Sequence, residues 1–317
     1  MRALVFDGAA ARVLDRPEPT PAADRAIVRV ALAGVCRTDL ELCRGYLDFR
    51  GVLGHEFVGT VADGPDAWRG ARVVGEINFA CGRCALCARG LGRHCPARTV
   101  MGIAGADGAM AELVSVPVAN LHRVPDGVAD ERAVFTEPLA AAFEVLEQVA
   151  IEPGVRAIVL GDGKLGLLVA QVLDAAGARV TALGHHPAKG AILARRGIEA
   201  VRAEDFTGAP APVVVEATGT VAGFRRAVEL VEPRGTLVLK STTHAREPLD
   251  LAPLVVHEVT IVGSRCGPFA PALAALAAGR IEVEALVGAR FPLAHAAEAL
   301  DRAAERDTLK VLIDCRS

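Results

Sequence analysis

The side chains best suited to chemistry are a thiol, an imidazole and two carboxylates in the first half of the chain, namely Cys36, His55, Glu56 and Glu137. His55 and Glu56 form a turn between two apolar runs in VLGHEFVGTV, and Glu137 opens the predicted helix FTEPLAAAFEVLEQV. Thiolate, imidazole and carboxylate are zinc ligands, and three of them leave one position open for a substrate. On local evidence the alternatives stay open, because a buried inert cysteine, a surface turn and a charged helix start give the same pattern.

A second group of thiols indicates a metal site more specifically. Cysteines at positions 81, 84, 87 and 95 form C-x2-C-x2-C-x7-C in a loop that contains glycine. Four thiolates can enclose one tetrahedral ion and leave no open position, which is typical of a structural zinc site. An iron–sulfur cluster is the alternative, but the last spacing differs from the ferredoxin pattern and no second cluster motif follows in the sequence. The loop therefore predicts structural zinc bound by Cys81, Cys84, Cys87 and Cys95.

A dinucleotide-binding fingerprint opens the second half of the chain. The apolar run AIVLG leads into GDGKLG, and the helix LLVAQVLDAA and the strand RVTAL follow. In this setting the G-x-G-x-x-G motif lets the backbone approach a pyrophosphate, and the helix N-terminus supplies N–H donors. The residues predicted to bind the cofactor are Arg37, Gly161, Gly163, Lys164, Leu165, Gly166 and Thr218.

The residue after the strand RVTAL bears on the choice between NAD and NADP. NAD-specific Rossmann domains carry an acidic residue there, which binds the ribose 2′-hydroxyl. Here the position is Gly184, which leaves room for a phosphate and adds no negative charge, while His185 and Lys189 could bind that phosphate. An ordinary solvated turn is the alternative. The loop predicts that NADP is favoured over NAD, with use of both as the second possibility.

The spacing of apolar residues along the sequence predicts the strands and helices that position these side chains. Short β-branched runs between Pro- and Gly-rich turns predict a β-rich first part. From AIVLG to about residue 280, strands alternate with helices, which predicts an α/β architecture with a doubly wound parallel sheet of six strands. The tail FPLAHAAEALDRAAERDTLKVLID reads as one helix and one strand, and we expect it to return to the first domain.

Composition narrows the function classes. The 317 residues are 52% hydrophobic and 23% charged, with a net charge of −3, as in a globular enzyme with a sizeable core. No basic run is present, so we expect neither nucleic acid nor a membrane as a partner. No apolar run reaches the length of a membrane span or a signal peptide. Eight cysteines without a secretion signal favour thiols and metal over disulfides, and thus the cytoplasm.

Five motifs occur in the order found in the zinc-dependent medium-chain alcohol dehydrogenases: GVCRTD, GHE, the four-cysteine loop, TEPLA and GDGKLG. The sequence resembles that family over nearly its whole length. The resemblance implies a GroES-like β-barrel catalytic domain at residues 1–146 and 285–317, and a Rossmann domain at 147–284, with the active site between them. It also implies a homodimer or homotetramer that assembles through the Rossmann domain.

The same resemblance implies roles for single residues. Cys36 and His55 match two ligands of the catalytic zinc, and Glu137 matches the third ligand of the polyol and glucose dehydrogenase branches. Glu56 matches a glutamate that lies close to the metal and can replace its water. Thr38 matches the hydroxyl residue that hydrogen-bonds the alcohol. Glu41 stands where liver-type enzymes end their proton relay with a histidine, so a different proton exit is needed. We expect Thr38 to pass the proton on toward Glu41 or toward a ribose hydroxyl of the cofactor.

These residues predict reversible hydride transfer between NAD(P) and a small alcohol, polyol or sugar hydroxyl. The residues that hold zinc argue against two alternatives. One is a nicotinamide-binding sensor or scaffold without turnover. The other is a zinc-free quinone or enoyl reductase, which lacks the zinc ligands and the cysteine loop. The chain is shorter than is usual in the family, so the resemblance does not identify the substrate.

Overall fold

The computed structural model describes residues 1–241 and 249–317, and the chain divides into two compact units. The first unit consists of Met1–Glu137, Leu276–Ala278 and Val283–Ser317, and the second of Pro138–Ala275 and Gly279–Glu282. The boundary between the two units lies between Glu137 and Pro138, at the start of helix α4 (Thr136–Gln148). The sequence predicts it near the end of that helix, after residue 146. Glu137 thus belongs to the unit that holds the other proposed zinc ligands.

A seven-strand sheet organises the first unit. Its strands are β3 (Arg25–Val35), β5 (Glu56–Asp63), β6 (Arg72–Gly75), β10 (Leu113–Pro117), β11 (Leu121–Arg123), β18 (Val287–Pro292) and β19 (Lys310–Asp314). They follow the order β11-β6-β5-β3-β19-β18, with β10 also paired to β3. β3 is buried along most of its length and is bulged against β5 at two places, which lets the sheet curve.

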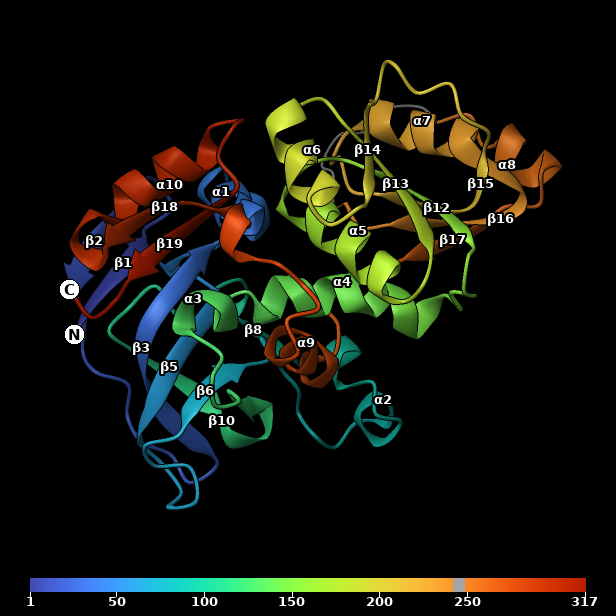
Figure 1. Cartoon of the computed structure of the whole chain (residues 1–317). Helices are drawn as coiled ribbons and strands as arrows, with labels where there is room; N and C mark the ends of the chain where they lie inside the picture. The colour runs from blue at the N-terminus through green and yellow to red at the C-terminus, as the bar shows by residue number, and fades with distance from the viewer. Residues whose placement is uncertain (242–248) are drawn as a thin grey trace. The chain divides into compact units, whose positions relative to one another are not determined.

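The C-terminal segment completes this sheet. β19 runs antiparallel to β3, with Val311 opposite Val35. Figure 1 shows β18 and β19, in red, beside β3, in blue. Helix α10 (Ala296–Ala304) buries Ala296, Ala299, Leu300 and Ala303, the spacing of one helical face, and packs on β18 and β19. The expected return of the tail to the first domain is confirmed.

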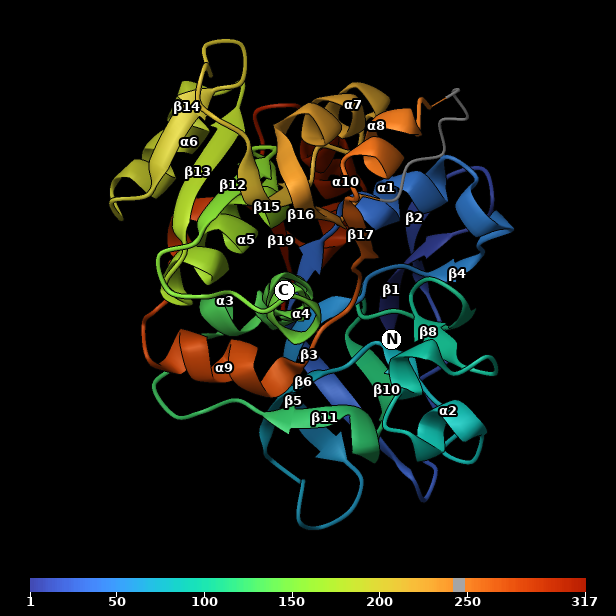
Figure 2. The same ribbon diagram turned by 90° about the vertical axis from the view of Figure 1, so that its right-hand side faces the viewer.

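Shorter elements surround the main sheet of the first unit. One three-strand sheet consists of β1 (Arg2–Phe6), β2 (Ala11–Asp15) and β4 (Gly51–Val52). Another consists of β7 (Asn78–Phe79), β8 (Thr99–Met101) and β9 (Gly105–Ala106). Besides α10, this unit contains the shorter helices α1 (Arg37–Cys43), α2 (Ala85–Ala88) and α3 (Asp130–Ala133). Figure 2 shows α2 and β8, in teal, in one lobe of this unit.

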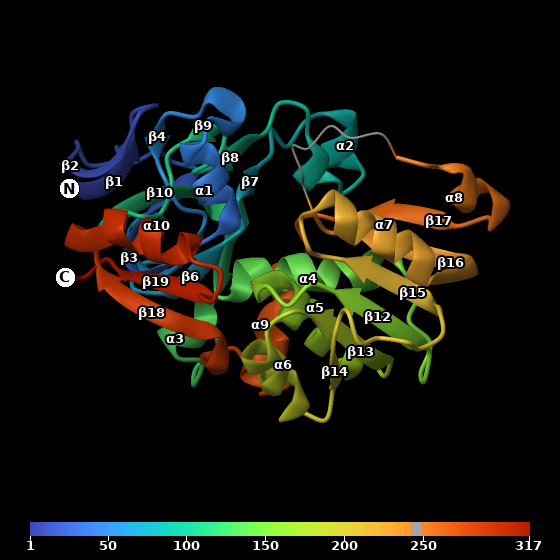
Figure 3. The ribbon, with the colours of Figure 1, turned by 90° about the horizontal axis from the view of Figure 1, so that it is seen from above.

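The second unit is a doubly wound α/β domain. Its six parallel strands are β12 (Arg156–Leu160), β13 (Arg179–Gly184), β14 (Glu199–Arg202), β15 (Ala211–Glu216), β16 (Val231–Leu239) and β17 (Thr260–Gly263). Their order, β14-β13-β12-β15-β16-β17, is visible in Figure 3. From β12 the chain first adds β13 and β14 on one side of the sheet, and it then adds β15, β16 and β17 on the other side. Because the crossovers between parallel strands are right-handed, this reversal puts helices on both faces of the sheet. The predicted six-strand sheet is confirmed.

Helices of the second unit are α5 (Lys164–Ala175), α6 (Pro187–Ala194), α7 (Val221–Leu230) and α8 (Ala252–Val256), together with most of α4 and most of α9 (Phe269–Ala277). Ala227 and Leu230 of α7 join one core with the strand residues Ile158, Val214 and Leu237. These strands read as continuous apolar runs because both faces of the sheet are covered. Within the described ranges, no helix is long and apolar enough to cross a membrane.

Candidate active site and cofactor motif

Cys36 lies at the junction between β3 and α1. It is the N-cap of α1, with extended backbone angles of φ −99° and ψ 159°. Its backbone N–H donates a 2.8 Å hydrogen bond to Oδ2 of Asp39, a fully buried carboxylate in the first turn of the helix. A cap of this kind fixes where the helix begins, and so the direction in which the thiol leaves the backbone. The Cys36 sulfur lies 3.7 Å from Oγ1 of Thr38.

Strand pairing brings His55 and Glu56 to that thiol. β5 begins at Glu56 and pairs antiparallel with β3, with Gly34 opposite Glu56. A Cβ on Gly34 would lie 2.2 Å from Oε2 of Glu56, so only glycine leaves room for this carboxylate. Cys36, His55 and Glu56 each offer a ligand atom, and these three atoms lie within 4.8 Å of one another.

The chemistry of this group fits a zinc ion. Sulfur, imidazole nitrogen and carboxylate oxygen converge, and Oε1 of Glu56 is a buried acceptor for which the described residues supply no hydrogen bond. His55 Nδ1 lies 3.3 Å from Oδ1 of Asp39, which leaves the other ring nitrogen as the ligand. Burial lowers the pKa of His55, but Asp39 and Cys36 raise it well above its usual value. A cation that binds here would therefore release a proton.

Lys310 is a member of this group that the sequence analysis missed. The first residue of β19, it is almost fully buried, forms an ion pair with Oε2 of Glu56 and donates a 3.2 Å hydrogen bond to the Val35 carbonyl. Burial lowers the pKa of Lys310, but the negative groups Glu56, Cys36 and Glu137 raise it above its usual value, so the ammonium stays charged. A lysine inside the apolar strand LKVLID was the signal, since buried lysines are rare unless paired.

Glu137 is not one of the three converging residues. It is half-buried in the first turn of α4, and its charge acts on Lys310. This places it within electrostatic range of the site, and its role as a zinc ligand stays a prediction. Thr136 is the first residue of α4, and its hydroxyl donates a 2.6 Å hydrogen bond to the Ala133 carbonyl.

The proposed proton path begins on α1. Thr38 is half-buried, and Glu41 lies one turn further on the same helix face. Oε1 of Glu41 accepts hydrogen bonds from Arg37 at 3.1 Å and from Arg44 at 2.8 Å. Arg37 is thus engaged by Glu41 on the surface of the first unit. The proton-transfer roles of Thr38 and Glu41, and the cofactor contact of Arg37, stay predictions.

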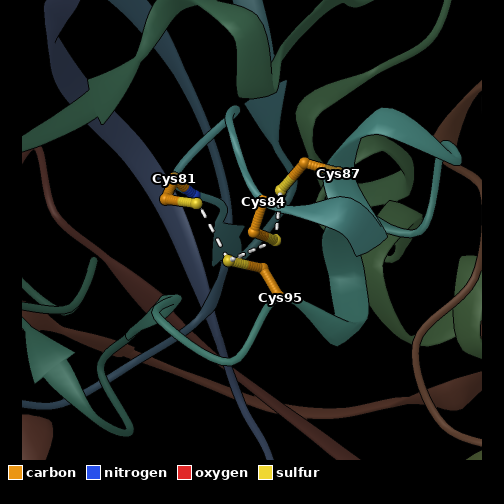
Figure 4. A group of neighbouring side chains, drawn as sticks. All are labelled: Cys81, Cys84, Cys87 and Cys95. Carbon is orange, nitrogen blue, oxygen red and sulfur yellow. Dashed lines mark hydrogen bonds between the residues drawn. The ribbon is translucent and has the colours of Figure 1, made fainter.

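The four-cysteine loop is the second group of side chains that could hold a metal ion. Figure 4 shows the sulfur atoms of Cys81, Cys84, Cys87 and Cys95 gathered around one centre. Cys84 Sγ lies 3.4 Å from Cys87 Sγ and 3.8 Å from Cys95 Sγ. A tetrahedral zinc ion with sulfur ligands at about 2.3 Å needs sulfur atoms roughly 3.8 Å apart, so the spacing fits a closed structural site.

The electrostatic surroundings of these thiols favour a bound cation. The N–H of Arg83 lowers the pKa of Cys81 to about 6, whereas the hydrogen bond with Cys84 raises the pKa of Cys87 to about 11. In the metal-free loop the thiols therefore cannot all ionise near neutral pH. Zinc binding would deprotonate all four and couple the order of the loop to the metal.

Exchange of Cys87 for serine is expected to remove one zinc ion per chain and to lower the thermal unfolding temperature. The three remaining thiolates no longer close the coordination shell, so the loop loses its cross-link. Metal analysis and a melting curve would measure both effects, with Cys266→Ser as the control because Cys266 lies outside both metal-binding groups. A Cys87→Ser protein that loses zinc but keeps its stability and activity would contradict a structural role.

The glycine motif has the geometry that a dinucleotide needs. Gly161 directly follows β12 and has φ +112°, and Gly163 is the N-cap of α5. A Cβ on Gly166 would lie 1.9 Å from the Gly161 carbonyl oxygen, so the helix can approach the strand only with glycine there. Lys164 and Leu165 begin α5. These residues form the strand–turn–helix that the sequence predicted, and their contact with a cofactor stays a prediction.

The turn after β13 holds a side chain that the sequence analysis did not consider. A Cβ on Gly184 would lie 2.5 Å from Oδ2 of Asp162, so a carboxylate lies beside Gly184, and the contact of Gly184 with a cofactor stays a prediction. A motif specifies the backbone turn but not the direction of the side chain between its first two glycines. The His185 ring is exposed and pairs with Glu204 at 3.2 Å, while Lys189 is buried.

Thr218, at the carboxyl end of β15, turns back on its own strand. Its N–H and its hydroxyl both donate 2.6 Å hydrogen bonds to Oε1 of Glu216, a buried carboxylate. The carboxyl ends of parallel strands are where Rossmann domains bind their ligands, which keeps Thr218 a candidate for cofactor contact.

Comparison with known proteins identifies the family. Residues 22–126 match the family model of the alcohol dehydrogenase GroES-like domain, and residues 165–278 match that of the zinc-binding dehydrogenases. The chain is 29% identical to L-galactonate-5-dehydrogenase of Escherichia coli K12, covering 90% of each sequence. It is 28% identical to a sorbitol dehydrogenase of Halalkalibacterium halodurans, covering 95% of this chain and 94% of that protein.

Solved structures agree with the fold, and two of the three described here contain a nicotinamide cofactor. Alcohol dehydrogenase TADH from Thermus sp. ATN1 superposes with a TM-score of 0.90, 31% identity and 99% coverage of both chains. RspB from Escherichia coli CFT073, complexed with NADH, has a TM-score of 0.92 at 26% identity, covering 99% of both chains. A zinc-binding dehydrogenase from Sinorhizobium meliloti 1021, bound to NADP, has a TM-score of 0.90 at 26% identity, covering 99% of this chain and 98% of that one. The chain therefore belongs to the zinc-dependent medium-chain dehydrogenase family, as an oxidoreductase that transfers hydride between a hydroxyl group and a nicotinamide cofactor.

Proposed function

We propose that the substrate is a polyol or a sugar-derived hydroxyl compound, oxidised reversibly to a carbonyl. The observation that carries the proposal is the convergence of Cys36, His55 and Glu56, with the Thr38 hydroxyl 3.7 Å from the Cys36 sulfur. Glu137, which matches the third zinc ligand of the polyol and glucose dehydrogenase branches, supports the same class of substrate. The names of the two curated relatives, acting on galactonate and sorbitol, support it further.

Each residue then has a defined task. Cys36, His55 and Glu137 would hold the zinc ion, and Asp39 fixes the imidazole orientation. When bound, zinc supplies a positive charge that favours loss of the hydroxyl proton of the substrate. Oγ1 of Thr38 would accept that proton and release its own, either to Glu41, on the partly exposed face of α1, or to a ribose hydroxyl of the cofactor, and from there it would reach solvent.

A screen of alcohols tests this proposal. Zinc-loaded protein would be assayed with polyols, sugar acids and simple alcohols, each with NAD and with NADP, and metal content would be measured on the same sample. We expect turnover of at least one polyol or sugar acid, and its loss after treatment with a chelator. Binding of the dinucleotide without turnover of any alcohol would instead favour a sensor or scaffold.

For the cofactor, we propose that both dinucleotides can be bound and that the ribose 2′-position sets the preference. The preference for NADP that the sequence predicts is supported by the absence of an acid at position 184 and by His185 nearby. Asp162 acts against it, because its carboxylate fills the space beside Gly184. The two relatives solved with a cofactor contain NADH and NADP respectively, so they do not indicate which of the two this chain prefers.

We also propose a homodimer or homotetramer in the cytoplasm. β17 lies at one end of the six-strand sheet, and its Ile261 is 43% exposed, with Val255 and Val256 of the preceding helix more than 70% exposed. An apolar strand edge of this kind is suited to pairing with a second copy. A mass of one chain, measured by light scattering, would exclude the dimer and the tetramer.

All eight cysteines are thiols, which supports a location in a reducing compartment such as the cytoplasm.

A further inference from the structure

Asp162 is the part of the glycine motif that the proposed function does not yet use. Its side chain crosses from the β12–α5 turn to the end of β13, where its Cβ and Oδ2 both lie 2.5 Å from the position that a Cβ on Gly184 would take. Gly184 is the last residue of β13, the place from which Rossmann domains usually present an acid to the ribose. The chain therefore carries a carboxylate beside Gly184, and this carboxylate comes from the turn after β12 and not from β13 itself.

Hydrogen bonds hold the carboxylate there. Oδ2 of Asp162 accepts from the backbone N–H of His185 at 2.8 Å and of His186 at 2.7 Å, and it lies 2.9 Å from Nδ1 of His186. The side chain is only 16% exposed. Burial raises the pKa of Asp162, but these hydrogen bonds lower it below its usual value, so the group is ionised near neutral pH.

The surrounding charges leave little that would attract a phosphate. His185 pairs with Glu204 at 3.2 Å, and Glu204 also pairs with Arg202, the residue opposite Gly184 on β14. Two backbone N–H groups of the turn, which could otherwise bind a phosphate, already donate to Asp162. A 2′-phosphate would have to displace one carboxylate and compete with a second for His185 and Arg202.

We infer that Asp162 is the specificity-determining residue at the ribose 2′-position, where it takes the place of the missing acid on β13 and favours NAD over NADP. This inference rests on the proposed use of a nicotinamide dinucleotide, and it reverses the preference that Gly184 alone predicts. A ribose with two hydroxyls can donate to the carboxylate, whereas a 2′-phosphate meets a like charge at short range. The residue acts on cofactor choice and takes no part in hydride transfer.

Asp162→Asn tests the charge with little change of shape, since the amide oxygen can still accept from the two N–H groups. Dissociation constants for NADH and NADPH, measured by fluorescence titration, give a ratio that a general loss of structure would not shift toward one cofactor. We expect wild-type protein to bind NADH more tightly and the variant's relative affinity for NADPH to rise about tenfold or more. Asp205→Asn, an equal charge change on an exposed side chain of the same region, should leave the ratio unchanged.

A swap of the acid provides the second test. Gly184→Asp alone should destabilise the protein, because its Cβ would collide with Asp162, whereas Asp162→Gly together with Gly184→Asp moves the acid to the usual strand and should retain the preference for NADH. Tighter binding of NADPH by wild type, or an unchanged ratio in Asp162→Asn, would overturn the inference while dinucleotide binding stands. Failure of wild type to bind either cofactor would refute the proposed function itself, and the inference with it.

Discussion

Replacement of Thr38 by valine is expected to lower kcat about 100-fold, the effect of losing a positioned proton-transfer group. Valine keeps the β-branched shape of threonine, so helix α1 and the backbone of its N-cap Cys36 should be preserved. What disappears is the hydroxyl that lies 3.7 Å from the Cys36 sulfur. Steady-state kinetics with a substrate from the screen would measure kcat, and cofactor titration would show an unchanged dissociation constant.

Thr38→Ser is the matched control, because it restores the hydroxyl without the methyl group. We expect it to recover most of the turnover that Thr38→Val loses, with the same zinc content in both variants. A valine variant with wild-type kcat would remove Thr38 from the mechanism. A valine variant that also loses zinc would instead assign the residue a role in holding Cys36, its neighbour at the start of α1.

The parts of the fold that could be predicted are those written in local patterns. β12 and β15 are continuous apolar runs because they are buried on both faces, so their parallel sheet was evident from sequence. Cys81, Cys84, Cys87 and Cys95 lie within one loop, and their spacing alone indicated a closed zinc site.

The parts that could not be predicted depend on side-chain direction or on distant partners. GDGKLG specifies a backbone turn, but not that Asp162 reaches across to the space beside Gly184. The partner of Glu56 lies 254 positions along the chain, at Lys310, and only the pairing of β19 with β3 brings the two together. No local pattern encodes such a pair, although a lysine in an apolar strand should prompt a search for a buried acid.

That buried pair leads to the prediction with the largest expected effect on stability. Lys310→Met is expected to destabilise the first unit by about 3–5 kcal/mol, the cost of leaving one charge of a buried pair uncompensated. The two side chains are only 2% and 1% exposed, so water cannot solvate the Glu56 carboxylate once the ammonium is gone. Methionine fills a similar volume and packs against Phe135, whose ring centre lies 5.8 Å from the Lys310 nitrogen.

Urea unfolding of chelated protein would measure the loss without interference from zinc. Arg302→Met is the control, because Arg302 pairs with Glu305 on the surface, where such a pair contributes at most about 1 kcal/mol. The double variant Lys310→Met with Glu56→Gln should recover part of the lost stability, since it removes the orphaned charge as well. If Lys310→Met loses no more stability than Arg302→Met, or if Glu56→Gln adds its own full cost to it, the pair is not energetically coupled. Recovery in the double variant would show that Lys310 is retained to balance the negative charge that gathers at the active site.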